Sequence, residues 1–168
     1  MRNVIACSLV IGLFASSAAA EQARGGAGKP AVKACSLLPK DLAMKVSGAA
    51  NKSVFDLPPD EETLGTSGSA CEYGDIRVQI DAFGPEVVDR TAKAQERGAG
   101  STRAASWVPV SGVGDRAYFN ADRNYAELMG YVGGRTFTIQ MGVPFQSTAE
   151  TIKPNVIALA NAIVAKLK

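Results

Sequence analysis

The segment Tyr125–Val143 reads YAELMGYVGGRTFTIQMGV and carries the strongest strand signal in the chain. Its second half alternates apolar with polar residues, which is the period of a strand that has one buried face. Gly133-Gly134 separates the two halves, at a place where a tight hairpin turn needs residues that tolerate positive φ. We therefore predict an antiparallel hairpin with strands Tyr125–Val132 and Arg135–Val143.

Three further strands are predicted outward from this hairpin. Cys71–Tyr73 and Ile76–Ala82 are joined by a tight turn at Gly74-Asp75, and Ala117–Phe119 lies after a glycine-rich turn. In the strand Ile76–Ala82, apolar residues alternate with Arg77, Gln79 and Asp81. We therefore expect one side of the sheet to be wet or covered by polar groups.

Three helices are expected around these strands. The first follows Cys35, with Pro39 in its first turn and Gly48 just past its end. The second is Pro85–Arg97, which begins with proline and ends before glycine. The third starts at Ser147-Thr148-Ala149-Glu150, which matches a capping box, and its regular part is expected from Pro154 onward.

The resulting order is helix, two strands, helix, three strands, helix. Short connections between strands favour antiparallel pairing, and helices need an apolar surface to cover. We predict an α+β fold with an antiparallel sheet of about five strands, helices on one face and one disulfide. The segment 49–69, with Pro58-Pro59 and the acids Asp60, Glu61 and Glu62, is expected to be a long exposed loop.

The start of the chain resembles an export signal. Residues 1–20 combine Arg2, an apolar stretch from Val4 to Ala15 and the small residues Ala18-Ala19-Ala20. We predict cleavage before Glu21, a flexible linker over 21–33 and a single α+β domain over 34–168. The apolar stretch is shorter than the ~20 residues of a membrane-spanning helix, so no integral membrane segment is expected after cleavage. Lipid attachment at Cys7 is the alternative, but the apolar core follows that cysteine instead of preceding it.

Two cysteines, Cys35 and Cys71, remain after removal of the signal. In an oxidising compartment such a pair is expected to form a structural disulfide. A redox pair and a metal site are the alternatives. A redox pair usually has C-x-x-C spacing, and two cysteines without histidine do not complete a zinc site.

The composition excludes several classes of chemistry. The 168 residues include no histidine, so histidine bases, histidine-dependent triads and histidine metal sites are absent. The formal net charge of +2 comes from 18 basic and 16 acidic residues, and the aromatic residues are not interleaved with a basic cluster. Nucleic acid is therefore not expected as a partner, and no cofactor or metal is predicted.

Two loops are candidate sites. Gly112-x-Gly114-x-x-Ala117 resembles a dinucleotide-binding fingerprint, but an extended segment follows it, so a turn with positive φ is the favoured interpretation. The glycine-rich segment before Trp107 can form a contact surface, or Trp107 can anchor the loop in the core. The residues predicted as a possible binding surface are Trp107, Arg103, Asp115 and Arg116.

Three short motifs suggest a family. They are Cys35-Ser36-Leu37-Leu38, Cys71-Glu72-Tyr73 and Gly112-Val113-Gly114-Asp115-Arg116-Ala117. This layout resembles small exported bacterial domains of unknown function, many of them lipoproteins, with the pattern C-x-L-L, C-x-Y and G-x-G-D-x-A. The resemblance covers Ala34 to Lys168 and implies a compact α+β envelope domain with a Cys35–Cys71 bridge and no catalytic residue. The chain departs from the lipoproteins because it lacks a properly placed cysteine for lipid attachment.

These observations favour a non-enzymatic binding or accessory domain in the periplasm or outside the cell. Its partner is expected to be an envelope protein or a small ligand, bound on the wet face of the sheet or on the loops near Trp107 and Gly112–Asp115. The alternative function is a small, histidine-free extracytoplasmic enzyme that uses carboxylates. A third possibility is a purely structural component of the envelope.

Overall fold

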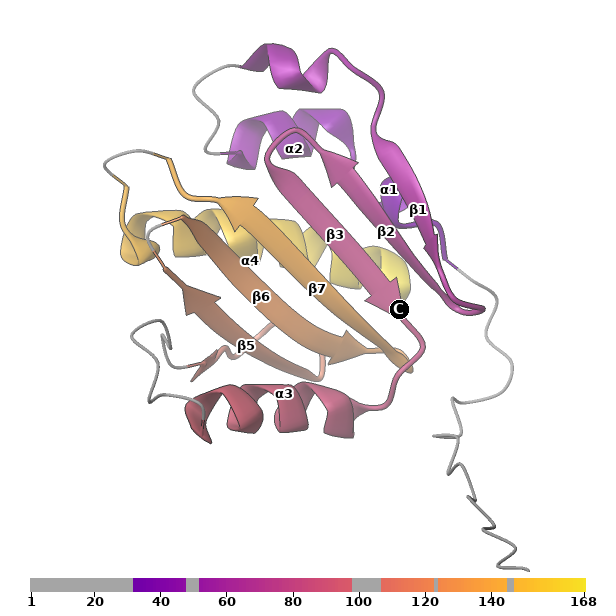
Figure 1. Ribbon diagram of the computed structural model, residues 1–168, viewed down its shortest axis with the longest axis vertical. Coiled ribbons are helices and arrows are strands. Elements are labelled where there is room, and N and C mark those ends of the chain that lie inside the picture. The colour runs from indigo at the N-terminus through magenta and orange to yellow at the C-terminus, as the bar shows by residue number, and fades with distance from the viewer. Residues whose placement is uncertain (1–31, 48–51, 98–106, 123, 145–146) are drawn as a thin grey trace, which may run out of the picture.

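The computed structural model describes residues 32–47, 52–97, 107–122, 124–144 and 147–168. Within them the chain forms an α+β fold with four α-helices and a seven-stranded antiparallel sheet (Figure 1). The strands are β1 (Asp60–Leu64), β2 (Gly68–Tyr73), β3 (Ile76–Asp81), β4 (Val108–Pro109), β5 (Arg116–Ala121), β6 (Tyr125–Val132) and β7 (Arg135–Gly142). The helices are α1 (Ala34–Leu37), α2 (Lys40–Val46), α3 (Pro85–Arg97) and α4 (Ala149–Leu167), with a short 3-10 helix η1 (Lys52–Phe55). The strands lie in the order β1-β2-β3-β7-β6-β5-β4.

The predicted hairpin is confirmed and forms the middle of the sheet. Val132 of β6 pairs with Arg135 of β7 across Gly133 and Gly134, whose φ angles are 58° and 82°. Positive φ at both central residues gives a turn whose twist matches that of the strands. β7 also pairs with β3, so residues far apart in the sequence lie side by side.

The main core lies between the sheet and α1, α2 and α4, which cross behind the sheet in Figure 1. Alternate residues of the central strands, including Val78, Leu128 and Ile139, are fully buried against Val156 and Leu159 of α4. The predicted disulfide is confirmed: it joins Cys35 of α1 to Cys71 of β2, with the two Cα atoms 4.9 Å apart. The bond holds the first helix against the same face of the sheet.

The sheet has seven strands, so the expectation of about five was wrong. β1 lies in the segment predicted to be a loop, and the two-residue strand β4 pairs with the outer side of β5. Four of the five residues of β1 are exposed, three of them acidic. A strand without a buried face has no alternation of apolar and polar residues. β1 forms because its backbone pairs with β2, so its sequence alone does not indicate a strand.

The expectation of helices on one face was also wrong, because α3 packs on the other face. Val88 and Ala92 of α3 contact a second, smaller apolar cluster that contains Trp107 and Met129. In β6, Met129 and Tyr131 alternate with core residues, so this strand has apolar side chains on both sides. A strand of this kind is covered on both faces.

Two helix boundaries differ from those predicted. The first helix is divided into α1 and α2, and Pro39 precedes α2 with extended backbone instead of lying in its first turn. A proline disfavours helical conformation in the residue before it, which explains the break at Leu38. The last helix begins at Ala149, not at Pro154, and its cap pairs Thr148 with Thr151 through an N–H to hydroxyl hydrogen bond of 3.0 Å.

Both outer strands of the sheet resist further pairing. β1 presents Asp60, Glu61 and Glu62 at one edge, and β4 at the other edge contains Pro109, which has no amide hydrogen. Charges and proline on edge strands are the usual means of preventing pairing with another chain.

Candidate functional site

The side of the sheet opposite α4 is polar over β1, β2, β3 and β7, and α3 covers its β5–β6 end and also contacts β7 (Figure 1). Residues that pair across neighbouring strands point to the same side of a sheet, so the register identifies the residues on this side. Arg77 of β3, for example, pairs with Glu72 of β2 and with Gln140 of β7. We call this surface the polar face. It comprises Asp60, Glu62, Glu72, Arg77, Gln79, Asp81, Tyr125, Glu127, Thr138 and Gln140.

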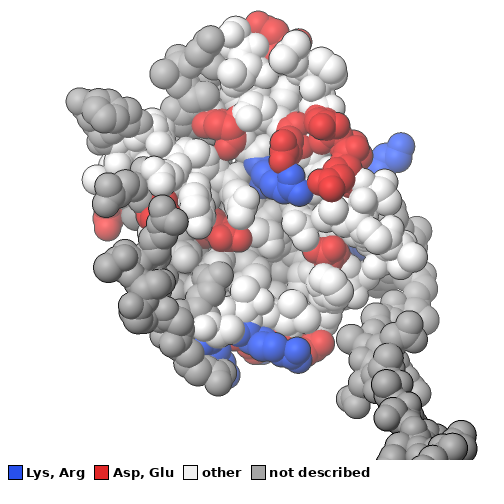
Figure 2. Space-filling view, viewed as in Figure 1, with Lys and Arg blue, Asp and Glu red and all other residues white. Residues whose placement is uncertain are grey.

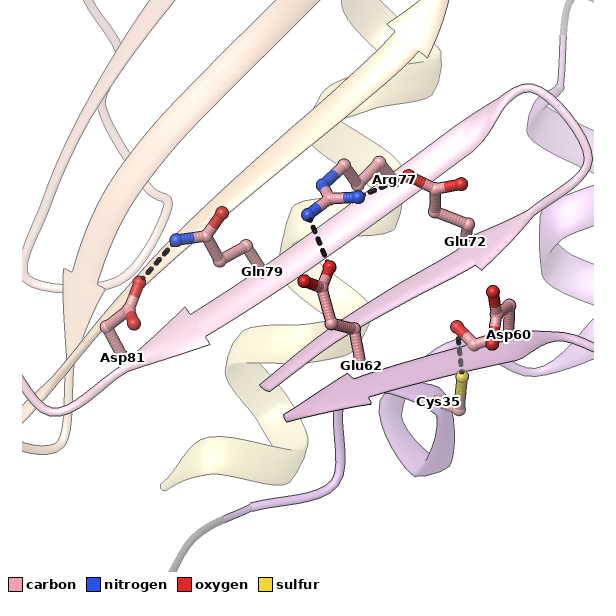
Figure 3. Close-up of polar contacts among 7 residues, drawn as sticks. All are labelled: Cys35, Asp60, Glu62, Glu72, Arg77, Gln79 and Asp81. Carbon is pink, nitrogen blue, oxygen red and sulfur yellow. Dashed lines mark hydrogen bonds and ion pairs between the residues drawn. The ribbon is translucent and has the colours of Figure 1, made fainter. Parts of the chain in front are cut away.

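Arg77 connects three strands of the polar face. Its guanidinium donates to Glu62 of β1 over 3.1 Å and forms an ion pair with Glu72 of β2 (Figure 3). The hydrogen bond to Glu72 is the largest influence, and it raises the pKa of Arg77, although partial burial opposes this shift. Arg77 therefore remains charged and holds the two carboxylates beside it.

Two amide side chains organise the rest of the face. Gln79 donates to Asp81 on the same strand over 2.8 Å, and Gln140 donates to Glu127 on the neighbouring strand over 3.4 Å. Burial raises the pKa of Glu127 above its ordinary value, and the hydrogen bond from Gln140 partly offsets this rise. Desolvation disfavours the charged form of a carboxyl group, so burial makes Glu127 harder to ionise.

Three adjoining hollows of about 330, 240 and 180 Å³ lie on this face, and Arg77 lines all of them. The largest is bordered by Asp75, Tyr125 and Gly142, the second by the acids of β1, and the third by Glu127 and Thr138. Figure 2 shows acidic side chains gathered around a basic one over this part of the sheet. The hollows are open to solvent, so they form a contact surface rather than an enclosed cavity.

The four residues predicted as a possible binding surface lie away from the polar face or outside the described residues. Trp107 is 3% exposed and packs with α3, as in the alternative in which it anchors its loop. Arg116 forms an ion pair with Asp89 of α3, and Asp115 is exposed in a turn where its amide donates to the Tyr131 carbonyl. Arg103 lies outside the described residues. The structure does not bring Trp107, Asp115 and Arg116 together as one exposed surface.

The turn at Gly112 and Gly114 has positive φ at both glycines, 80° and 59°, as predicted. An extended strand follows it, β5, and not the helix start that a dinucleotide fingerprint requires.

Alternation in the strand of Arg77, Gln79 and Asp81 predicts these residues on a wet face, but this pattern does not indicate the glutamates around them. Glu62 lies in a segment with the composition of a loop, and Glu72 lies in a strand whose pattern covers only Cys71–Tyr73. Glu127 could have been found as a charged residue in the middle of an apolar strand, because such a position requires a polar neighbour.

Comparison with protein-family models, with curated proteins and with solved structures found no match to this chain. None of the helices in the described part of the chain is long and apolar enough to span a membrane. Among the described residues, no group of three or more acidic or cysteine side chains is placed to hold a metal ion.

Proposed function

We propose that this protein is an exported, non-enzymatic binding domain, acting in the periplasm or outside the cell, and that the polar face is its binding surface. The observation that carries the proposal is the position of α3. This helix covers the apolar end of that side of the sheet and leaves the polar face uncovered beside it.

The construction of the polar face supports a binding role. Its side chains stand on five neighbouring strands, and four of these, β2, β3, β7 and β6, have their opposite side packed against the core, so the sheet fixes their positions. A rigid scaffold lowers the entropy that is lost when a partner binds. The disulfide adds to this rigidity, because Cys71 directly precedes Glu72 and is bonded to α1.

The disulfide also agrees with export, since such bonds form and persist in oxidising compartments. The predicted signal at residues 1–20 and the resemblance to small exported bacterial domains point the same way. An envelope protein is a partner that fits these surroundings.

The second candidate is an enzyme that uses carboxylates, and the observation that favours it is Glu127. A carboxyl group with a raised pKa can act as a general acid. The hydrogen bond described for its carboxylate comes from the amide of Gln140, which cannot exchange protons as an acid or base near neutral pH. The binding function therefore accounts for more of the polar face than the enzymatic one.

Site-specific photo-crosslinking in the producing cells tests the binding function. A photoreactive residue at Gln140, which is exposed on β7, reports contacts of the polar face. The matched control carries the same residue at Asn161, exposed on α4 on the other side of the sheet. We expect a discrete adduct from position 140 that is absent or much weaker from position 161. No adduct at 140, or equal adducts at both positions, contradicts the proposal.

A further inference from the structure

We infer that the occupant of the polar face is an extended basic peptide segment of a partner protein, with Lys or Arg side chains at alternate positions. This inference rests on the proposed function and names the chemical class of the partner.

The polar face carries an excess of negative charge. The polar face holds five carboxylates and one guanidinium, whereas the whole chain has a formal net charge of +2. Lys153 and Lys166 of α4, and Lys168 at its C-terminal end, lie on the other side of the sheet, and the basic residues Arg90 and Lys93 lie on α3, outside the polar face. The charge is therefore distributed unevenly, and the polar face is electrostatically complementary to a cation.

The carboxylates are distributed along and across the strands of the polar face. Asp60 and Glu62 are two residues apart on β1 and point to the same side, so they are about 7 Å apart. Glu127 lies on β6, four strand spacings from β1, which corresponds to roughly 19 Å. A small cation contacts only a few of these groups. About six residues of an extended chain span the same distance, and alternate side chains of such a chain point to one side.

One end of the polar face has an excess of hydrogen-bond acceptors. Asn120 of β5 pairs in register with Glu127, and its side-chain oxygen is buried without a hydrogen-bond partner among the described residues. Glu127 beside it is a half-buried carboxylate that receives one long hydrogen bond. A primary ammonium group placed here donates to both oxygens, which satisfies a buried acceptor and offsets the desolvation of the acid.

An aromatic residue lies at the edge of the largest hollow. Tyr125 borders the largest hollow and is 45% exposed, although it is a large side chain on a strand. An exposed tyrosine ring beside carboxylates suits a cationic side chain, which binds the ring face as well as the acids.

The test measures binding of labelled decapeptides to the purified, disulfide-bonded protein by fluorescence anisotropy. The probe has alternating Lys and Ala, and its matched control has alternating Glu and Ala. We expect the Lys peptide to bind, the Glu peptide not to bind, and added salt to weaken the binding because the contacts are ionic.

Variants locate the contact. The double variant Glu62→Gln/Glu127→Gln should weaken binding of the Lys peptide by about tenfold, and Asp41→Asn on α2 should leave it unchanged. Arg77→Gln removes the one cation of the face and should strengthen binding severalfold. Circular dichroism of each variant checks that the fold is retained.

Failure of the Lys peptide to bind, or equal binding to all variants, overturns the inference. Concentration-dependent dimers that disappear in Glu62→Gln/Glu127→Gln overturn it as well, because the occupant is then a second copy of the chain. If the adduct at position 140 is present while the Lys peptide fails, the polar face remains the binding surface and only the basic class of partner is wrong. If both fail, the proposed function fails too.

Discussion

The carboxylate of Asp89 on α3 accepts a hydrogen bond from the hydroxyl of Tyr118 on β5, with 3.0 Å between the two oxygens. The other carboxylate oxygen of Asp89 forms an ion pair with Arg116, also on β5. These contacts lie beside the small apolar cluster under α3, so they fix where the helix sits along the strand. The position of α3 in turn sets the limit of the polar face.

Replacement of Asp89 by Ala should therefore loosen α3. We expect the free energy of unfolding to fall by about 1 to 2 kcal/mol, since two partly exposed polar contacts are lost. Trp107, the only tryptophan of the chain, packs under α3, and its fluorescence emission should shift to longer wavelength. Arg90→Ala, an exposed neighbour on the same helix, is the control and should change neither quantity. Unchanged emission in Asp89→Ala contradicts a role in docking the helix.

Gly74→Ala should be much more harmful than Gly65→Ala. Both glycines have positive φ, 65° and 59°, which costs an alanine about 1 kcal/mol. A Cβ at position 74 lies 2.6 Å from the ring of Phe55, whereas one at position 65 meets no atom within 4 Å. Phe55 is fully buried, so we expect Gly74→Ala to cost roughly 1 to 3 kcal/mol more in urea unfolding. Equal costs at the two positions contradict the close contact.

Loss of the disulfide should destabilise the protein without removing its fold. The Cys35–Cys71 bond closes a loop with a sequence separation of 36 residues, for which chain entropy gives about 3 to 4 kcal/mol. We expect this difference in urea unfolding between the native protein and the double variant Cys35→Ala/Cys71→Ala. A reducing agent should lower the stability of the native protein and leave the double variant unaffected. If the reducing agent changes nothing in the native protein, the bond does not contribute to its stability.

The stability of the native protein should depend on the protonation of Glu127. Burial raises the pKa of this carboxyl in the folded protein above its value in the unfolded chain. The folded protein therefore binds the proton more tightly, and ionisation of Glu127 lowers stability as the pH rises through the range just above the ordinary carboxyl pKa. Glu127→Gln removes this loss, so the variant should gain stability relative to the native protein at neutral pH. The gain should shrink as the pH falls through that range, in urea unfolding measured from pH 3 to 8. A gain that is constant with pH contradicts the assignment.

The fold could be predicted where a residue pattern had a single physical cause. The hairpin of β6 and β7 follows from alternation and two glycines, and the disulfide follows from two cysteines in a chain with a predicted export signal. β1 could not be predicted, because an exposed acidic strand has the composition of a loop and depends on backbone pairing with β2. The side on which α3 packs depends on Met129 and Tyr131, whose orientation is settled only when the register of β6 is known.

The polar face was predictable in part for a related reason. Alternation in β3 identified Arg77, Gln79 and Asp81 as polar residues on one side of the sheet. Their partners come from strands that are distant in the sequence, such as Glu62 on β1 and Glu127 on β6. Only the strand order, with β7 inserted between β3 and β6, places these carboxylates on one surface.

The acidic outer strand β1 and the proline in β4 affect how copies of the protein associate at high concentration. A seven-stranded sheet left open at both ends could recruit neighbours and grow into fibres. Repulsion between the acidic β1 strands of two copies opposes pairing at one edge of the sheet. At the other edge, Pro109 of β4 lacks the amide hydrogen that pairing needs. Pairing of copies through their sheet edges should therefore be disfavoured at high concentration.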